Sequence, residues 1–326
     1  MFSMRFDMRV PGFTAEQITA QYQCALEMAA YADSHAQARI GLVEHHASDD
    51  GYLSSPLVLA SAMAAVTERT PIMIAATLLP LYEPVRLAED IVQLDYISAG
   101  RVSYVMGIGY RPVEYELFGL EYERRGAIVE EKINQLLTVL DAANEASREM
   151  RVTPALRSPI KQIISYGGGS KPAARRAGRL GLNFFAQANF PGLREAYEAG
   201  AREAGHEPGI CALPELDRPN IVFVHDDLDA AWDELGPFLL HDAMSYASWN
   251  ENAGRPTISL STEQTVEGMR EEQGAYRVVT CEGARELIAQ WGALPLSPLC
   301  GGLPPDRAWP YLRRVVEEVM PSLGPA

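Results

Sequence analysis

The feature that most constrains this chain is a regular alternation of short apolar runs with longer segments of helical spacing. The strand-like runs cover residues 4–10, 40–43, 71–79, 102–107, 162–166, 183–186, 220–224 and, weakly and interrupted by proline, 294–300. The helical patterns begin at residue 14 and then cover 55–67, 84–97, 125–142, 172–180, 192–204, 228–240, 281–290 and 307–319. Eight such repeats predict an α/β fold, a parallel (β/α)8 TIM barrel rather than an open sheet.

The pattern also indicates the domain organisation. No Gly-x-Gly-x-x-Gly follows the first strand, so the chain lacks the fingerprint of a dinucleotide-binding fold. No linker rich in proline, glycine or serine divides the chain into halves. We therefore expect a single barrel domain over residues 1–326, with loop insertions that include a polar, irregular insertion at about 245–276.

Charge limits the partners of such a barrel. The chain has 28 Lys and Arg against 43 Asp and Glu, a net charge of −15. An acidic surface repels phosphate backbones and anionic headgroups, so we expect no nucleic acid and no membrane partner. The four cysteines are scattered without a CxxC, and residues 1–12 do not resemble a signal peptide. We therefore expect a cytoplasmic protein with reduced thiols.

Glu44, His45 and His46 follow the second strand, at the end where barrels place active sites. Three interpretations fit this motif: a metal site, a titratable histidine in a pocket, or a hydrogen-bonded structural pair. Successive side chains of a strand point to opposite faces, so His45 and His46 do not readily share one metal ion. Because no third ligand is evident, we expect no metal and favour a titratable histidine.

Gly167, Gly168, Gly169 and Ser170 lie between the fifth strand and a helix. A glycine-rich turn at a helix N-terminus offers free N–H groups and a favourable dipole to an anion. Three basic residues, Lys171, Arg175 and Arg176, add positive charge nearby. This pattern predicts a phosphate site, and the alternative is a tight turn whose glycines only relieve steric crowding.

Two further strand ends carry small residues. Gly107 begins the run Gly-Ile-Gly-Tyr-Arg after the fourth strand, and a glycine there lets the backbone approach a flat ligand closely. Ala75 and Ala76 lie near the end of the third strand and leave room for a bulky group. In both places the alternative is ordinary packing or a turn.

Taken together, these segments resemble the bacterial luciferase-like flavin monooxygenase family. The resemblance is ordered and correctly spaced over about residues 40–120, continues through the Gly169-Ser170 turn and its helix to about 181, and is looser beyond. It is carried by Val43–His46, Ala75–Pro80, Pro84–Asp90, Leu94-Asp95, Ser98, Gly100-Arg101, Phe118-Gly119 and Gly169-Ser170. It implies an eight-stranded barrel, usually dimeric, that binds reduced FMN or, in one branch, the deazaflavin F420 at its C-terminal mouth.

The resemblance also implies roles for individual residues. The family's catalytic histidine falls on His45, preceded by its acid at Glu44. A non-proline cis peptide that supports the flavin ring falls on Ala75-Ala76, the residue near the reactive flavin carbon falls on Gly107, and the phosphate-binding serine falls on Ser170, after Gly168 and Gly169.

The chain departs from the family at three positions. Ile108 stands where the luciferase branch has a phosphate-binding arginine, so Arg111, Arg175 or Arg176 would have to replace it. Asp49 and Tyr110 stand where F420-dependent sugar phosphate dehydrogenases have tryptophan and glutamate, which argues against that chemistry but not against F420 itself.

The principal hypothesis from the sequence is a flavin-dependent monooxygenase. It would use O₂ and reduced FMN, supplied transiently by a separate flavin reductase, on a small or medium apolar organic substrate. An F420-dependent oxidoreductase that transfers hydride without O₂ is the first alternative. A flavin-binding barrel without turnover is the second, and a homodimer is expected in each case.

Overall fold

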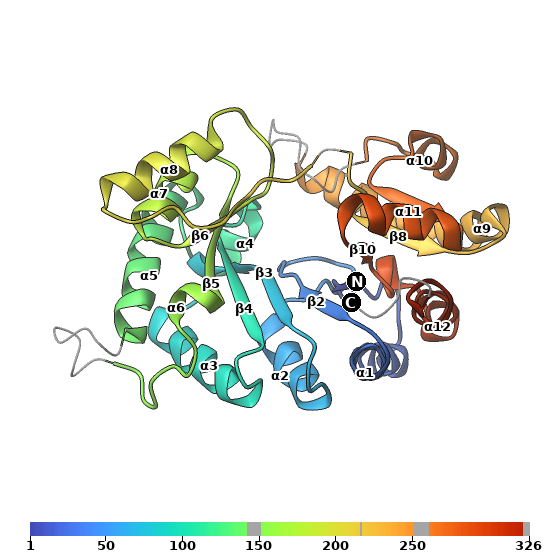
Figure 1. Ribbon diagram of the computed structural model, residues 1–326, viewed down its shortest axis with the longest axis horizontal. Helices are drawn as coiled ribbons and strands as arrows, with labels where there is room; N and C mark the ends of the chain where they lie inside the picture. Colours follow the sequence, from blue (N-terminus) through green and yellow to red (C-terminus); the bar gives the residue numbers. More distant parts are fainter. Residues whose placement is uncertain (142–150, 216, 251–260, 322–326) are drawn as a thin grey trace.

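The computed structural model describes residues 1–141, 151–215, 217–250 and 261–321. Its main element is a curled parallel sheet of eight strands with the order β10-β1-β2-β3-β4-β5-β6-β7 (Figure 1). The strands are β1 (Phe2–Phe6), β2 (Ala38–Leu42), β3 (Ile72–Leu78), β4 (Val102–Gly107), β5 (Ile164–Gly168), β6 (Asn183–Ala186), β7 (Cys211–Ala212) and β10 (Leu294–Leu296).

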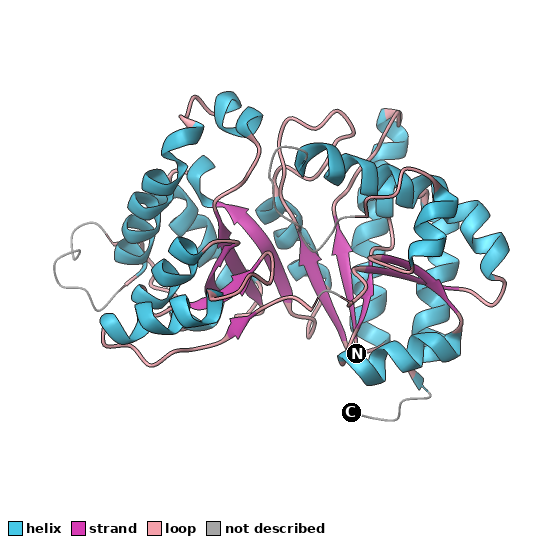
Figure 2. Ribbon diagram, turned by 90° about the horizontal axis from the view of Figure 1, so that it is seen from above, coloured by secondary structure: helices cyan, strands magenta, loops and turns pink. Residues whose placement is uncertain are grey.

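Helices lie outside the curled sheet and bury its outer face (Figures 1 and 2). They are α1 (Ala15–His35), α2 (Pro56–Val66), α3 (Pro84–Ile97), α4 (Pro112–Leu117), α5 (Arg125–Leu140), α6 (Ile160–Ile163), α7 (Lys171–Arg179), α8 (Leu193–Glu203), α9 (Leu228–Asn250), α10 (Val266–Glu272), α11 (Cys281–Trp291) and α12 (Pro305–Arg314). Shorter turns are η1 (Leu79–Leu81), η2 (Tyr122–Arg124), η4 (Cys300–Gly302) and η5 (Val315–Val319). No helix within the described ranges is long and apolar enough to cross a membrane.

The seventh predicted strand is placed wrongly. Residues 220–224 form β8 (Ile221–Val224), which pairs with β9 (Tyr276–Val279) in a separate two-stranded sheet. The edge of the main sheet is β7 instead, and its two residues pair with β6. A strand of two residues carries no periodicity, so the sequence gives no sign of it. Within the described residues no ladder joins β7 to β10, and the fold shown is a curled sheet rather than a closed ring.

The predicted irregular insertion at 245–276 is also partly wrong. Helix α9 continues to Asn250, ten residues beyond the predicted end, and α10 and the start of β9 follow within the same range. Ala243 and Tyr246 are buried and continue the helical spacing of apolar residues in α9. Polar residues between them make this spacing hard to recognise in the sequence. Residues 251–260 of the predicted insertion lie outside the described residues.

Glycines set the packing of α7, the helix that begins after Ser170. A Cβ added at Gly178 would lie 2.1 Å from the carbonyl oxygen of Tyr197 in α8, and one at Gly200 would lie 2.2 Å from that of Arg175. The backbones of α7 and α8 therefore approach each other directly at these two glycines.

We expect Gly178→Ala to destabilise the protein. The added methyl group would overlap backbone atoms that cannot move aside, and overpacking of this kind costs roughly 1–3 kcal/mol or more. Gly126→Ala is the matched control, because a Cβ there meets nothing within 4 Å. Denaturant unfolding should show lowered stability for Gly178→Ala and unchanged or raised stability for Gly126→Ala. Equal stabilities would refute the packing argument.

Candidate active site

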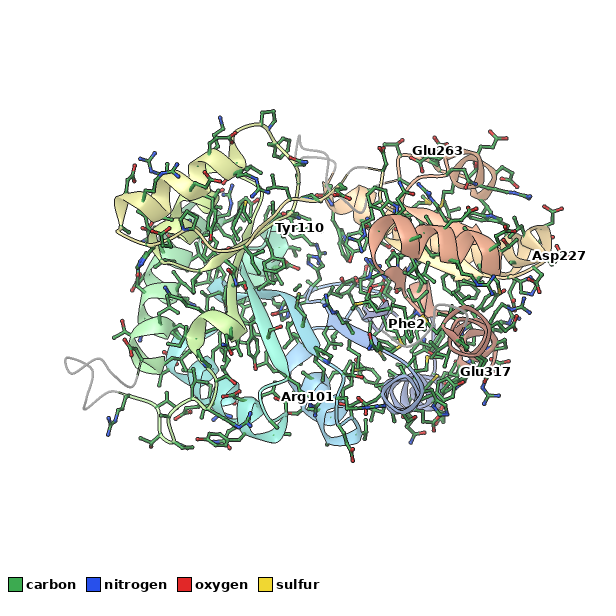
Figure 3. The ribbon with its side chains drawn as sticks, in the orientation of Figure 1. Phe2, Arg101, Tyr110, Asp227, Glu263 and Glu317 are labelled. Carbon is green, nitrogen blue, oxygen red and sulfur yellow. The ribbon has the colours of Figure 1, made fainter. Side chains whose placement is uncertain are left out.

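His45 lies immediately beyond β2, at the carboxyl ends of the parallel strands. The residue is 7% exposed, and its Nδ1 lies 2.8 Å from Oε1 of Glu114, which belongs to α4. Its backbone N–H donates to the carbonyl of Leu53 (3.1 Å). Figure 3 shows Tyr110 and Arg101, which flank β4, at opposite ends of that strand, with Tyr110 at the end that carries this site.

Glu114 is the partner that the sequence analysis missed. Its side chain is fully buried, and its Oε1 accepts three hydrogen bonds: from His45 Nδ1, from the His46 backbone N–H (3.0 Å) and from Arg111 Nη1 (3.2 Å). Helix α4, which carries it, has six residues and was not predicted. The only signal in the sequence is a carboxylate three residues after Arg111.

Glu44 and His46 form a second, separate pair. His46 Nε2 lies 2.9 Å from Glu44 Oε1, and Glu44 Oε2 accepts the backbone N–H of Leu78 in β3 (3.0 Å). Burial raises the pKa of Glu44. The two histidines thus have different partners, as strand geometry predicts. Glu44, predicted to be catalytic, ties the end of β2 to β3 and does not contact His45 in the described hydrogen bonds.

Aromatic rings surround His45. Tyr52, Tyr110 and Trp249 have ring centroids 5.1, 5.3 and 4.8 Å from that of His45, and Tyr246 lies at 6.3 Å. The Tyr110 hydroxyl lies 3.4 Å from His45 Nε2. The C-terminal half of α9 supplies Tyr246 and Trp249, so a helix far along the chain closes the site. His45 is therefore buried among aromatic rings, with little of its surface open to solvent.

A buried charge network holds α9 in this place. Arg9, which follows β1 and is fully buried, donates through Nε to Asp242 of α9 (3.1 Å) and through Nη1 to Asp50. Its guanidinium carbon lies 4.7 and 4.8 Å from the ring centroids of Tyr52 and Trp249. Because a buried charge is costly unless paired, Asp242 and Asp50 fix the position of Arg9 and of the rings stacked on it.

The two members of the His45–Glu114 pair have shifted pKa values. Burial lowers the pKa of His45, against the opposing effect of the Glu114 carboxylate. Burial alone would raise the pKa of Glu114, but the hydrogen bonds from His45 and His46 and the charge of Arg111 bring it below its ordinary value. At neutral pH the pair is therefore a neutral imidazole beside an ionised carboxylate, the state in which a histidine can accept a proton.

The small residues of β3 and β4 lie side by side. The Ala75-Ala76 peptide bond is cis, as the resemblance implied, and the β3–β4 register shifts between Ala75 and Thr77. A Cβ added at Gly107 would lie 2.6 Å from the Cβ of Ala76, so only glycine fits opposite that alanine. The structure thus brings Ala75, Ala76 and Gly107 together at the strand ends next to β2.

The predicted phosphate turn ends β5. Gly168 is the last residue of β5, and the side chain of Ser170 caps α7 by accepting the N–H of Ala173 (3.4 Å). A Cβ at Gly168 would lie 2.7 Å from that of Ala173, whereas one at Gly169 would make only ordinary contacts. This turn lies three strands away from β2 in the sheet order.

The bases proposed to replace the missing arginine are engaged elsewhere. Arg175 pairs with Glu203, Arg176 pairs with Glu130 (2.9 Å), and Arg111 pairs with Glu114. Lys171, the first residue of α7, makes no ion pair among the residues that the structure describes. The described ranges also contain no cluster of three or more potential metal ligands. The structure therefore gives the metal interpretation no support.

Comparison with known proteins gives the family. A profile described as luciferase-like monooxygenase matches residues 4–291. The chain belongs to this family, whose curated relatives include monooxygenases, and it is an enzyme.

Curated relatives are distant. An uncharacterised protein of Sinorhizobium fredii, y4vJ, is 29% identical over 52% of this chain and 50% of its own length. The alkanal monooxygenase alpha chain of Photorhabdus laumondii is 24% identical over 76% of this chain and 69% of its own. The chain thus spans only about half of y4vJ.

Solved structures agree in fold. The monooxygenase RslO1 of Streptomyces bottropensis has a TM-score of 0.68 at 18% identity, covering 99% of this chain and 100% of that one. The oxygenating constituent of 3,6-diketocamphane monooxygenase from Pseudomonas putida, in complex with FMN, has 0.61 at 20%, covering 98% of each. An F420-dependent secondary alcohol dehydrogenase has 0.61 at 15%, covering 94% and 98%.

We expect His45→Ala to lower turnover about 10²–10⁴-fold, the usual contribution of a group that transfers a proton. His46→Ala should change turnover far less, because its ring bonds to Glu44 and not to the enclosure around His45. Turnover and melting temperature of both variants, with and without a chelator, separate the interpretations. Normal turnover in well-folded His45→Ala would contradict the catalytic role, and loss of turnover on chelation would support a metal.

Proposed function

We propose that this chain is a flavin-dependent monooxygenase that uses reduced FMN and O₂ on a small or medium apolar organic substrate. The observation that carries the proposal is the burial of the His45–Glu114 pair among aromatic rings at the carboxyl ends of parallel strands. An enclosure of this kind excludes water from a reaction in which water is a competitor. The polar pair inside it provides one site for a proton.

The residues present fit a flavin nucleotide. The side chains of Ala75 and Ala76 are small, and Gly107 has none, so the neighbouring strand ends leave the backbone open to a flat ring. Ser170 and Lys171 stand at the N-terminus of α7, where free N–H groups and the helix dipole favour a phosphate. Lys171 would supply the positive charge that Ile108 cannot.

The protein's own residues would transfer a proton and exclude water. Reduced FMN, when bound, supplies the electrons with which O₂ is split between substrate and water. His45 would accept or donate a proton at Nε2, since Nδ1 is engaged by the carboxylate of Glu114. Tyr52, Tyr110 and Trp249 would exclude water and bound the apolar part of the substrate.

We also propose a homodimer, a transient reductase partner and a place in the cytoplasm. Exposed apolar side chains on neighbouring helices support the dimer: Val58 of α2 is 72% exposed, and Tyr96 and Ile97 of α3 are 49% and 52% exposed. Helices α2 and α3 pack against each other, so these side chains can belong to one face.

The test of the proposal is cofactor choice with purified protein. Photoreduced FMN and reduced F420 are added separately, with and without O₂, and binding is followed by absorbance and by the mass of the retained cofactor. We expect retention of FMN and an O₂-dependent reoxidation rate that the protein alters. Retention of F420 alone, with hydride transfer that needs no O₂, would replace the proposal by the F420-dependent alternative.

Ser170 variants test the phosphate turn. Aspartate is as good a helix cap as serine, whereas alanine loses the cap at a cost of about 0.5–2 kcal/mol. We therefore expect Ser170→Asp to keep the melting temperature but weaken FMN binding strongly, since its charge opposes the phosphate. Ser170→Ala should lower the melting temperature and weaken binding less.

Lys171→Gln should weaken FMN binding as well, with Lys161→Gln, a change on the short helix before β5, as the matched control. Dissociation constants that stay the same in Ser170→Asp and Lys171→Gln would place the phosphate elsewhere.

A further inference from the structure

Arg111 stands just before α4 and is buried, with 7% of its surface exposed. Its guanidinium donates from Nη1 to Glu114 Oε1 (3.2 Å) and to the carbonyl of His46, and from Nη2 to the carbonyl of Ala47 (3.1 Å). These acceptors belong to α4 and to the segment after β2. One side chain therefore connects both elements that carry the His45–Glu114 pair.

The two backbone acceptors lie in a turn with an unfavourable backbone conformation. Ala47 has a φ of +47°, in the left-handed region that residues other than glycine rarely adopt. Arg111 accepts no hydrogen bond and presents a planar set of donors, which suits carbonyls from consecutive residues. It therefore holds the turn that directly follows His45 and His46.

The flat face of Arg111 makes a third contact. Its guanidinium carbon lies 4.2 Å from the ring centroid of Trp249, and Arg9 lies at 4.8 Å from the same ring. Trp249 in turn packs against His45. Arg111 thus links α9 to the same pair, and cation–π contacts in a desolvated site are among the stronger ones.

We propose that Arg111 is a positioning residue: it holds the Glu114 carboxylate against His45 Nδ1 and balances its charge, so that Nε2, beside the Tyr110 hydroxyl, carries no proton and can accept one. The proposal rests on the role proposed for His45. It assigns Arg111 a function different from the phosphate binding that the missing arginine at position 108 suggested, because its donors are already used within the protein.

Within the part of the chain that the structure describes, seven side chains face His45. These are Glu114, Arg111 and Tyr110 from the β4–α4 segment, Arg9 after β1, Tyr52 after β2, and Tyr246 and Trp249 of α9. Burial lowers the pKa of His45, the Glu114 carboxylate raises it, and the charges of Arg111 and Arg9 lower it. Removing the charge of Arg111, while Glu114 keeps its hydrogen bonds to His45 Nδ1 and to the N–H of His46, should therefore raise the pKa of His45.

The test is an NMR titration of the histidines in the cofactor-free, full-length protein. The chain has six histidines, and His45→Gln identifies the signal of His45. The variants are Arg111→Met and Arg111→Gln, which remove the charge, and Arg111→Lys, which keeps it. Arg202→Met is the matched control, since Arg202 is exposed on α8 and pairs only weakly with Glu198 (3.5 Å). FMN binding is measured in parallel.

We expect the neutral variants to bind a proton at His45 about tenfold more tightly, which raises its pKa by about one. Arg111→Lys should recover most of this change, and FMN affinity should fall little. An unchanged titration in a folded neutral variant would overturn the proposal. An equal rise of the His45 pKa in Arg111→Lys would also overturn it, because such a rise indicates that the substitution opens the site. A large loss of FMN affinity with an unchanged titration would overturn it as well, because that result indicates that Arg111 binds the phosphate.

This test is independent of turnover. If the titration changes as expected but His45→Ala keeps normal turnover, the proposed function fails while the placement of Arg111 stands. If Arg111→Met does not fold, Arg111→Gln serves as the neutral variant.

Discussion

One carboxylate oxygen organises the candidate site. Glu114 Oε1 receives donors from His45, from the backbone of His46 and from Arg111, and it does so without exposure to water. Three donors on a buried acceptor favour its ionised form, and an ionised carboxylate accepts but does not donate. The proton of the imidazole is thereby directed to Nδ1, and the orientation of the His45 ring follows from that bond.

The surroundings of this pair depend on a second buried network. Arg9 joins the end of β1 to Asp50 after β2 and to Asp242 in α9. Arg5 and Tyr276 also bond to Asp242, so β9 is tied to the same carboxylate. Segments more than two hundred residues apart in the sequence thus meet at a few charged side chains, and the ring of Trp249 contacts two guanidinium groups. Replacing one member would leave its buried partners with fewer opposing charges, and an incompletely paired buried charge is costly.

Much of the fold could be predicted from the sequence, because the spacing of apolar residues within a segment indicates whether that segment forms a helix or a strand. The bounds of α3, β4 and β6 agree with the sequence prediction, since each is a clear amphipathic or apolar segment with distinct ends. Strand β7 and helix α4 were not predicted, because segments of two and six residues show no recognisable periodicity of apolar residues. Strand β8 was assigned to the wrong sheet because a buried apolar run shows that a strand forms but not which strand it pairs with.

The candidate site divides in the same way. His45, Ala75, Ala76, Gly107 and Ser170 could be proposed because strand ends and a family resemblance place them, although their roles stay proposals. Glu114, Arg9 and Trp249 could not, because each acts through contacts with segments distant in the sequence. Arg111 was noticed as a positive charge, but only the structure shows that its donors are directed to Glu114 and two carbonyls.

The claim on which the rest depends is that Glu114 fixes the state of His45, and the ring nitrogens report this directly. A long-range ¹H–¹⁵N spectrum of the cofactor-free protein at neutral pH distinguishes the protonated from the bare nitrogen of each imidazole. The account predicts a proton on Nδ1 of His45 and a bare Nε2, with the two forms becoming mixed in Glu114→Gln. A proton on Nε2 with a bare Nδ1 in the wild-type protein would contradict it.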